Sequence, residues 1–388
     1  ISVSAFLLNR SSDLRFIPSL KWLSRETLQP VYCVDDAKYK GLQTTDASSP
    51  VHLMTTTITD ELEVTTGEFA VSYAIAPDRD MAVLMAGHVS DGAFWISDHT
   101  GSWCGTSYYG DYPKWAAVYE RMEPLSARIG SMTWKPIYDT GKAAFHYFEN
   151  IAFGQETYFS HSFSDASRVR QFKTSALVNE EVLQFVTRCV EGSYLGRDRV
   201  PDLLTIGLYA GNYEHLSARL APSELQDTYV RLDRVIYQLL AVLDQVFGKD
   251  GAFVVLSSTG YSDVNGGETD QKNYRIATGN FSMDRASMLL NMYLSAAYGQ
   301  AQYIEGTCGN HIYLNHKLLE QRQLRLDEVL ARCEHFMSQM SGVRAVYTAH
   351  NLALGAWDKK MSRISAGWNR ERSGDLVIDV SPGWQVNR

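Results

Sequence analysis

The sequence predicts an α/β protein built on a mostly parallel central sheet, and two observations support this fold class. We expect a buried strand at residues 201–208, a long helix at 222–247 and a second buried strand at 252–258. Strand, helix and strand with short connections form a right-handed βαβ unit. Helices and strands also alternate along the rest of the chain, as a sheet with helices on both faces requires.

The other elements follow from runs of apolar residues and their spacing. Residues 1–8 are expected to form a strand or a short buried helix. We expect one domain over residues 1–388, with 103–175 as an inserted, lid-like region, because large α/β domains often exceed the usual domain length. The further strands are expected at 69–75, 81–86, 93–96, 342–347 and 375–380, and the further helices at 60–66, 114–122, 176–191, 283–298, 326–340 and 349–361.

Composition and charge narrow the classes of function. The chain has 388 residues, of which 45% are hydrophobic and 21% charged, and its formal net charge is -8. A negative chain is a poor match for the phosphate backbone of nucleic acids, so we expect no nucleic-acid partner. The sequence has no uninterrupted apolar stretch of about 18 residues, so we expect no transmembrane segment.

The five cysteines do not point to a metal site. No two of them form a Cys-x-x-Cys pair, so a structural zinc knuckle is not expected. An odd number of cysteines leaves at least one thiol unpaired. The cysteines are Cys33, Cys104, Cys189, Cys308 and Cys333.

Short sequence blocks, spread over most of the chain in a consistent order, carry a family resemblance. The blocks are residues 31–36, 86–88, 91–95, 101–103, 106–109, 113–115, 163–165, 172–175, 201–204, 227–234, 312–315 and 372–375. With these blocks the chain resembles the alkaline phosphatase superfamily. Within it, the type I phosphodiesterase/nucleotide pyrophosphatase group is the most similar, especially the phosphate-irrepressible alkaline phosphatases of Bacteroidota. The resemblance implies an alkaline-phosphatase-like α/β fold.

The resemblance also implies a particular chemistry. In active members two zinc ions about 4 Å apart clamp the attacking and leaving oxygens of an in-line displacement. A Thr or Ser nucleophile sits on one metal, and Asp and His side chains hold both. In open α/β sheets such a site lies just beyond the carboxyl ends of the strands.

The first ligand position is altered in this chain. After the strand at 201–208 the family carries Asp, three spacer residues and His. Here Asn212 stands in place of the Asp and brings no charge, and the spacing to His215 is shorter by one residue. His215 or Glu214 could still face a metal ion.

The other ligand positions also lack the expected residues. After the second strand the family carries adjacent Asp and His, and the aligned pair here is Thr259 and Gly260. The family's C-terminal His lies beyond the counterpart of residues 382–384, and the sequence ends at Arg388, so we expect no counterpart for it. Residues 1–30 show no Asp signature for the first ligand and nucleophile. The sequence therefore predicts a degenerate site without a bound metal; the alternative cofactor is zinc.

The phosphate-binding side chains are expected to differ as well. The family carries a Lys-x-Arg pair on the strand before the Ala-Gly-His block. Counting back from that block, the two cationic positions become Asp78 and Asp80, and Arg79 falls between them. Because alternate residues of a strand face opposite sides, Arg79 is expected to point away from the site. A β-bulge would bring it back.

Three further residues are candidates for the cleft. His88 either lines it or, as we favour, is a structural side chain bonded to a nearby backbone group. Tyr213 and Tyr261 lie near the strand ends, where they could fill an emptied metal pocket.

Two classes of function follow, with a weaker third. The favoured hypothesis is a catalytically inactive pseudophosphatase that binds or scaffolds other proteins in a bacterial cell envelope, at the periplasm or cell surface to which the family is mostly exported. The alternative is a zinc-dependent phosphomonoesterase or phosphodiesterase with an atypical site. The third is a module that holds a sugar or nucleotide in the vacated cleft.

Overall fold

The chain folds into two compact units. The computed structural model describes residues 2–4, 20–138, 158–216, 220–258, 277, 279–355 and 359–387. The first unit comprises residues 1–8 and 33–264, and the second comprises 9–32 and 265–388. The expectation that residues 1–388 form a single domain stays a prediction.

A seven-stranded sheet forms the centre of the first unit among the described residues. Its order is β11-β1-β10-β5-β6-β7-β4. The five strands from β11 to β6 are parallel, whereas β7 and β4 run antiparallel to their neighbours. The strands are β1 (Ser2–Ser4), β4 (Gly41–Leu42), β5 (Ser72–Ile75), β6 (Gly92–Ile96), β7 (Trp103–Thr106), β10 (Leu203–Ile206) and β11 (Phe253–Val255).

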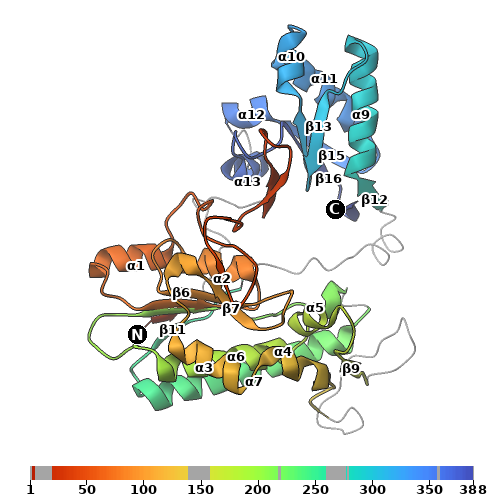
Figure 1. Cartoon of the computed structure of the whole chain (residues 1–388). Helices are drawn as coiled ribbons and strands as arrows, with labels where there is room; N and C mark the ends of the chain where they lie inside the picture. Colours follow the sequence, from red (N-terminus) through yellow and green to blue (C-terminus); the bar gives the residue numbers. More distant parts are fainter. Residues whose placement is uncertain are drawn as a thin grey trace. The chain divides into compact units, whose positions relative to one another are not determined.

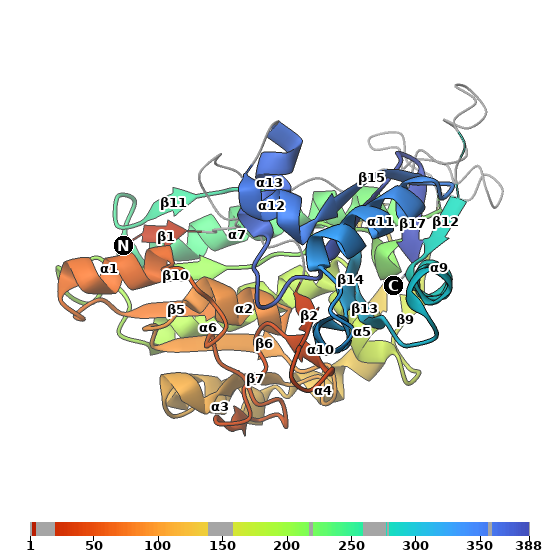
Figure 2. The ribbon, with the colours of Figure 1, turned by 90° about the horizontal axis from the view of Figure 1, so that it is seen from above.

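The βαβ unit expected from the sequence is present, but its two strands are not neighbours. Strand β1 lies between β10 and β11 and pairs with both, as Figure 2 shows from above. The second strand is also not buried: Phe253 is 67% exposed and Leu256, just after the strand, is 65% exposed. Strand β11 is an edge strand among the described residues.

Helices cover both faces of this sheet (Figure 1). Helices α1 and α2 lie on one face, and α3, α6 and α7 lie on the other. None of the described helices combines the length and the apolar character that a membrane span needs. The helices of the first unit are α1 (Ile58–Thr66), α2 (Arg79–Ala86), α3 (Lys114–Met122), α4 (Leu125–Arg128), α5 (Arg168–Lys173), α6 (Leu177–Gly192) and α7 (Pro222–Phe247), with short 3-10 turns η1 (Ser107–Tyr109), η2 (Ile129–Ser131) and η3 (Tyr213–His215) and a small hairpin of β8 (Thr133–Trp134) and β9 (His161–Ser162).

Helix α2 corrects one prediction. Residues 81–86 were expected to form a strand, and they form most of this helix. A short apolar run cannot be told apart as strand or helix by its pattern alone. Met81, Ala82 and Leu84 favour a helix, and the buried Ala82, Val83 and Ala86 recur at helical spacing.

The core of the first unit includes described residues of the segment expected to be inserted. Trp103, on β7, stacks on Phe185 of α6 with ring centroids 4.0 Å apart. Trp134 and Phe163 are fully buried in the same cluster. Part of the segment 103–175 therefore belongs to the central sheet, and more of it packs into the same apolar core.

Two buried carboxylates tie the helices to that core. Glu181 on α6 accepts hydrogen bonds from Trp103 Nε1 at 3.0 Å and Tyr119 OH at 2.7 Å, and it pairs with Arg128 at 2.8 Å. Asp227 on α7 is fully buried. It accepts a bond from Trp134 Nε1 at 2.6 Å and pairs with Arg231 at 2.7 Å. Each carboxylate is thus satisfied by several donors, as burial requires.

The second unit is built on an antiparallel sheet of order β13-β14-β16-β15. Val377 of β16 packs on α12 and α13, whereas its neighbours Leu376 and Ile378 face the cluster that contains α9 and α11. This alternation is the period of two of a strand. The elements are β2 (Lys21–Leu23), β3 (Pro30–Tyr32), β12 (Gly279–Ser282), α9 (Met283–Tyr298), β13 (Ile304–Cys308), β14 (His311–Leu314), α10 (His316–Gln321), α11 (Leu326–Ser338), β15 (Val343–Thr348), α12 (Ala349–Leu354), α13 (Lys359–Gly367), β16 (Leu376–Val380) and β17 (Trp384–Asn387).

The prediction of a single helix at 349–361 is wrong. Helix α12 ends at Leu354, and α13 begins at Lys359. Gly355, which follows α12, has a φ of 104°, a conformation that glycine adopts readily and that ends a helix. All five cysteines are free thiols, and Cys308 is the one that is not buried.

Loss of the Glu181 carboxylate should destabilise the first unit strongly. Glu181→Ala leaves Arg128 and two aromatic donors without their acceptor, and removing one partner of a buried pair costs about 3–5 kcal/mol. Urea unfolding measures the change. The matched control is Glu191→Ala on the same helix, which removes an exposed pair with Arg188 and should cost less than about 1 kcal/mol. Equal losses in the two variants would contradict the assigned role of Glu181.

Glu120 should make stability depend on pH near neutrality. Burial raises the pKa of Glu120 from 4.5 to about 7, although the backbone N–H of Trp103 donates a hydrogen bond to its carboxylate at 2.7 Å. Since the folded-state pKa is the higher one, this contribution to stability is complete below pH 4.5 and is lost as the pH rises through 7. The melting temperature of Glu120→Gln should therefore fall less than that of the wild type between about pH 5 and about pH 8. Parallel curves would rule the effect out.

Candidate functional site

The carboxyl ends of three parallel strands meet at one edge of the first unit's sheet. Strand β10 pairs in parallel with β5, and β5 with β6, so the residues that follow these strands lie near one another. They include Asp78 after β5, Asp98 after β6, and Tyr209 to His215 after β10. Thr259, Gly260 and Tyr261 lie outside the described residues.

Asn212 acts as a cap of the short turn η3. Asn212 is 8% exposed, and its Oδ1 accepts a hydrogen bond from the N–H of Tyr213 at 2.9 Å. The preceding loop is held from α6, where Asn179 both donates to the Tyr209 carbonyl and accepts from the Tyr209 N–H, each at 2.7 Å. Asn is a favoured residue at such a cap because its side-chain oxygen satisfies a free backbone donor.

The two residues that remained candidate ligands have unusual backbone conformations. Glu214 has a φ of 47° and His215 a φ of 57°, both in the left-handed region. For residues with a Cβ atom this costs roughly 1–2 kcal/mol each. Glu214 pairs with Arg170 at 3.5 Å, and His215 Nδ1 lies 3.5 Å from the Tyr209 hydroxyl.

Tyr213 packs into an aromatic cluster. Its ring stacks on His161 with centroids 4.2 Å apart and meets Trp134 edge-on at 5.6 Å. Burial raises the pKa of Tyr213 to about 12, so its hydroxyl stays protonated at neutral pH. His161 in turn lies 3.0 Å from the carboxylate of Glu224. The cluster therefore packs against η3.

His88 makes the contacts of a structural side chain. Its Nδ1 lies 2.9 Å from Asp60 and its Nε2 lies 3.1 Å from the carbonyl oxygen of Leu53. Burial opposes the charge of Asp60, but hydrogen bonds from His88 and Thr57 hold the pKa of Asp60 below its usual value. Both ring nitrogens of His88 are thereby engaged near α1.

The residues at 78–80 begin α2 rather than a strand. Asp78 is its N-cap residue, so the alternation used to orient Arg79 does not apply. Arg79 pairs with Asp35 at 2.8 Å and donates to Ser48 at 3.3 Å. The prediction that Arg79 points away assumed a strand, whereas Arg79 begins a helix. Asp80 lies in the first turn of the same helix.

A buried lysine at this edge was not recognised from the sequence. Lys173, the last residue of α5, pairs with Asp98 at 2.6 Å and with Asp78 at 2.9 Å. It belongs to the block 172–175, but its two partners lie far away in the chain, so no local pattern signals the cluster.

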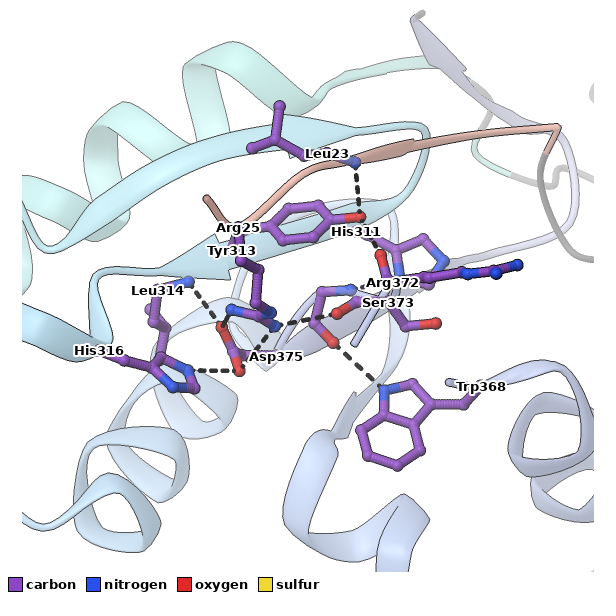
Figure 3. Close-up of polar contacts among 11 residues, drawn as sticks. Leu23, Arg25, His311, Tyr313, Leu314, His316, Trp368, Arg372, Ser373 and Asp375 are labelled. Carbon is purple, nitrogen blue, oxygen red and sulfur yellow. Dashed lines mark hydrogen bonds and ion pairs between the residues drawn. The ribbon is translucent and has the colours of Figure 1, made fainter. Parts of the chain in front are cut away.

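The second unit contains a separate polar cluster around Asp375 (Figure 3). This carboxylate is 2% exposed, and it accepts bonds from Leu314 N at 2.7 Å, His316 Nε2 at 2.8 Å and Arg25 at 3.2 Å. Burial opposes its charge, but these partners hold the pKa of Asp375 below its usual value. Arg25 also donates to the Ser373 carbonyl at 2.9 Å. The cluster therefore fastens the β2–β3 hairpin to β14 and β16.

The donors present at the sheet edge do not fit a zinc ion. A protein zinc site needs three or four ligands in close array. In the part of the chain that the structure describes, no three His, Cys, Asp or Glu side chains are grouped so that they could hold a metal ion. Asn212 is engaged as a cap, and Glu214 with an arginine.

Comparison with known proteins defines the class. A sequence model of the family described as type I phosphodiesterase / nucleotide pyrophosphatase matches residues 81–388. The match spans well over half of the chain, so the chain belongs to this family. This confirms the resemblance to the alkaline phosphatase superfamily.

Several individual proteins are similar over nearly the whole chain. A protein named calcium-transporting ATPase, from Myroides odoratus, is 27% identical over 381 residues, which cover 94% of this chain and 69% of the relative. The alkaline phosphatase PafA of Elizabethkingia meningoseptica is 25% identical over 382 residues, covering 94% and 68%. The alkaline phosphatase PhoV of Synechococcus elongatus is 22% identical over 379 residues, covering 94% and 67%.

A solved structure confirms the fold class. The crystal structure of wild-type alkaline phosphatase PafA matches with a TM-score of 0.75 at 23% identity, covering 94% of this chain and 72% of that chain. The α/β architecture with helices on both faces of the main sheet is therefore that of an alkaline-phosphatase-like protein.

Glycine at position 214 should relieve strain. Glu214→Gly removes the Cβ atom at a positive φ and should leave stability unchanged or raise it by about 1 kcal/mol. The matched control is Glu61→Gly on the exposed side of α1, which should lose about 1 kcal/mol because glycine is a poor helix former. Urea unfolding of both variants measures the difference. A loss at position 214 as large as that at position 61 would contradict the strained conformation.

Proposed function

We propose that this protein is a catalytically inactive alkaline-phosphatase-like protein, a pseudophosphatase that serves as a binding or scaffold subunit in a bacterial cell envelope. The observation that carries the proposal is that Asn212 stands at the expected Asp position and caps η3. At the end of β10, an uncharged amide caps η3 through the Tyr213 N–H.

The neighbouring residues support the same conclusion. Glu214 lies against Arg170 and His215 against Tyr209. Among the described residues, neither is grouped with the further ligands that a two-metal clamp requires. Asp78, one of the expected phosphate-binding positions, carries a negative charge and pairs with Lys173. Asp78 therefore offers no cation to a phosphate, and its own carboxylate is already paired within the protein.

The names of the relatives support the alternative. PafA and PhoV are named alkaline phosphatases, and an enzyme of this kind would need zinc and a site whose ligands include residues outside the described part of the chain. We keep a zinc-dependent phosphomonoesterase or phosphodiesterase as this alternative. The partners we propose are other envelope proteins, and the location is the periplasm or cell surface.

Metal content and turnover separate the two functions. The purified full chain should hold no stoichiometric zinc by elemental analysis and should hydrolyse an aryl phosphate at background rate with zinc added, because the described donors do not form a zinc site. The alkaline phosphatase PafA, assayed in parallel, is the positive control.

About two zinc ions per chain would contradict the proposal. So would hydrolysis that disappears in His215→Ala, because that loss would show that His215 works together with further ligands. The control for that variant is His99→Ala, which changes an exposed histidine paired with Asp46 at 3.5 Å and should leave any hydrolysis unchanged.

A further inference from the structure

A lysine ammonium is held in a cage of oxygen atoms at the carboxyl edge of the first unit's sheet. The Lys173 side chain is 8% exposed. Its Nζ lies 2.6 Å from Asp98 Oδ1, 2.9 Å from Asp78 Oδ1 and 3.3 Å from the Ile96 carbonyl oxygen. The ammonium thus contacts two carboxylates and one backbone carbonyl.

The three oxygens come from two different connections at the same edge. Asp78 follows β5 and begins α2, whereas Ile96 ends β6 and Asp98 lies two residues beyond it. Lys173 reaches them from the end of α5. One side chain therefore joins α5 to two connections that precede it by many residues. Lys173 and Asp98 are 75 positions apart.

The two aspartates remain open to water on their outer sides. The side chain of Asp78 is 51% exposed and that of Asp98 is 72% exposed, whereas the ammonium between them is covered. Burying an unpaired ammonium would cost several kcal/mol. Burial by itself lowers the pKa of Lys173, but Asp78 and Asp98 more than offset this and hold the pKa above its usual value.

Carboxylate and carbonyl oxygens are the ligands that hard divalent cations prefer in proteins. We infer that Lys173 is the resident cation of this edge: its ammonium occupies an oxygen cage that would otherwise take a divalent cation such as Ca²⁺ or Mn²⁺, and it ties the β5–α2 and β6–β7 connections together. This inference goes beyond the proposed function, because it concerns which cation neutralises the edge and not whether phosphates are hydrolysed.

The test removes the charge and keeps the bulk of the side chain. In the full chain, Lys173→Met should melt at a lower temperature than the wild type in the presence of a chelator, because the two carboxylates are left without their counter-ion. Added CaCl₂ should raise the melting temperature of this variant and leave that of the wild type unchanged. Calorimetric titration with Ca²⁺, and electron paramagnetic resonance with Mn²⁺, should detect binding to the variant alone.

Two controls make the result specific. The triple variant with Lys173→Met, Asp78→Asn and Asp98→Asn should lose the response to Ca²⁺, since it lacks the carboxylates. Arg188→Met, which breaks an exposed pair on α6, should melt like the wild type with or without Ca²⁺. A Lys173→Met variant that melts like the wild type and binds neither cation would overturn the inference.

A second measurement needs no variant. Brief acetylation of the folded wild-type chain, followed by peptide mass spectrometry, should label Lys173 at least about tenfold more slowly than the exposed Lys114, because a paired ammonium offers little free amine. Similar rates at the two lysines would overturn the inference even if Lys173→Met fails to fold. Zinc binding or phosphatase activity would contradict the proposed function and would leave both of these results unchanged.

Discussion

Parallel hydrogen bonding between β10 and β5, continued to β6 on one side and β1 on the other, decides which parts of this chain can act together. Parallel strands bring their carboxyl ends to a common edge, so segments separated by many residues meet there. Asp78, Asp98 and Asn212 each follow a different strand of this set. Any chemistry of the first unit at this edge depends on what these connections carry.

Several blocks that carry the family resemblance contain residues that stabilise the fold. Asp227, in the block 227–234, is fully buried and binds Trp134 and Arg231. Asp375, in the block 372–375, joins Arg25 and His316 in the second unit. A buried carboxylate with several donors is costly to change, because removing either partner leaves a charge unpaired. Such blocks therefore report ancestry and fold, whereas function depends on the site.

Long amphipathic segments were predicted well from the sequence. Helices α7 and α9 have the expected bounds, and β10 lies inside the expected strand. Their patterns extend over enough residues for burial on one face to determine the structure. The short run at 81–86 was assigned to a strand and is a helix, because eight residues or fewer do not separate the two periods. The placement of β1 between β10 and β11 could not be predicted either, since pairing partners are set by long-range contacts that no local pattern encodes.

The candidate site was predicted in part. The sequence identified Asn212, Glu214 and His215 at the end of β10, and the structure adds that Asn212 caps η3 and that the other two have positive φ angles. It missed Lys173. The residue has an ordinary sequence context, and its significance arises only when α5 carries it to Asp78 and Asp98. An ion triad of this kind is a property of tertiary structure.

Covalent attachment makes a lysine a different kind of counter-ion from a metal. A bound metal stabilises a fold by an amount that grows with its free concentration relative to its dissociation constant. The Lys173 ammonium is delivered by α5 whenever the unit is folded, so its neutralising effect on Asp78 and Asp98 needs no ion from solution. Its stabilising effect is limited instead by the cost of desolvating the ammonium and by solvent screening of two aspartates that are half exposed or more. A sheet edge held in this way keeps its connections in place without an ion from solution.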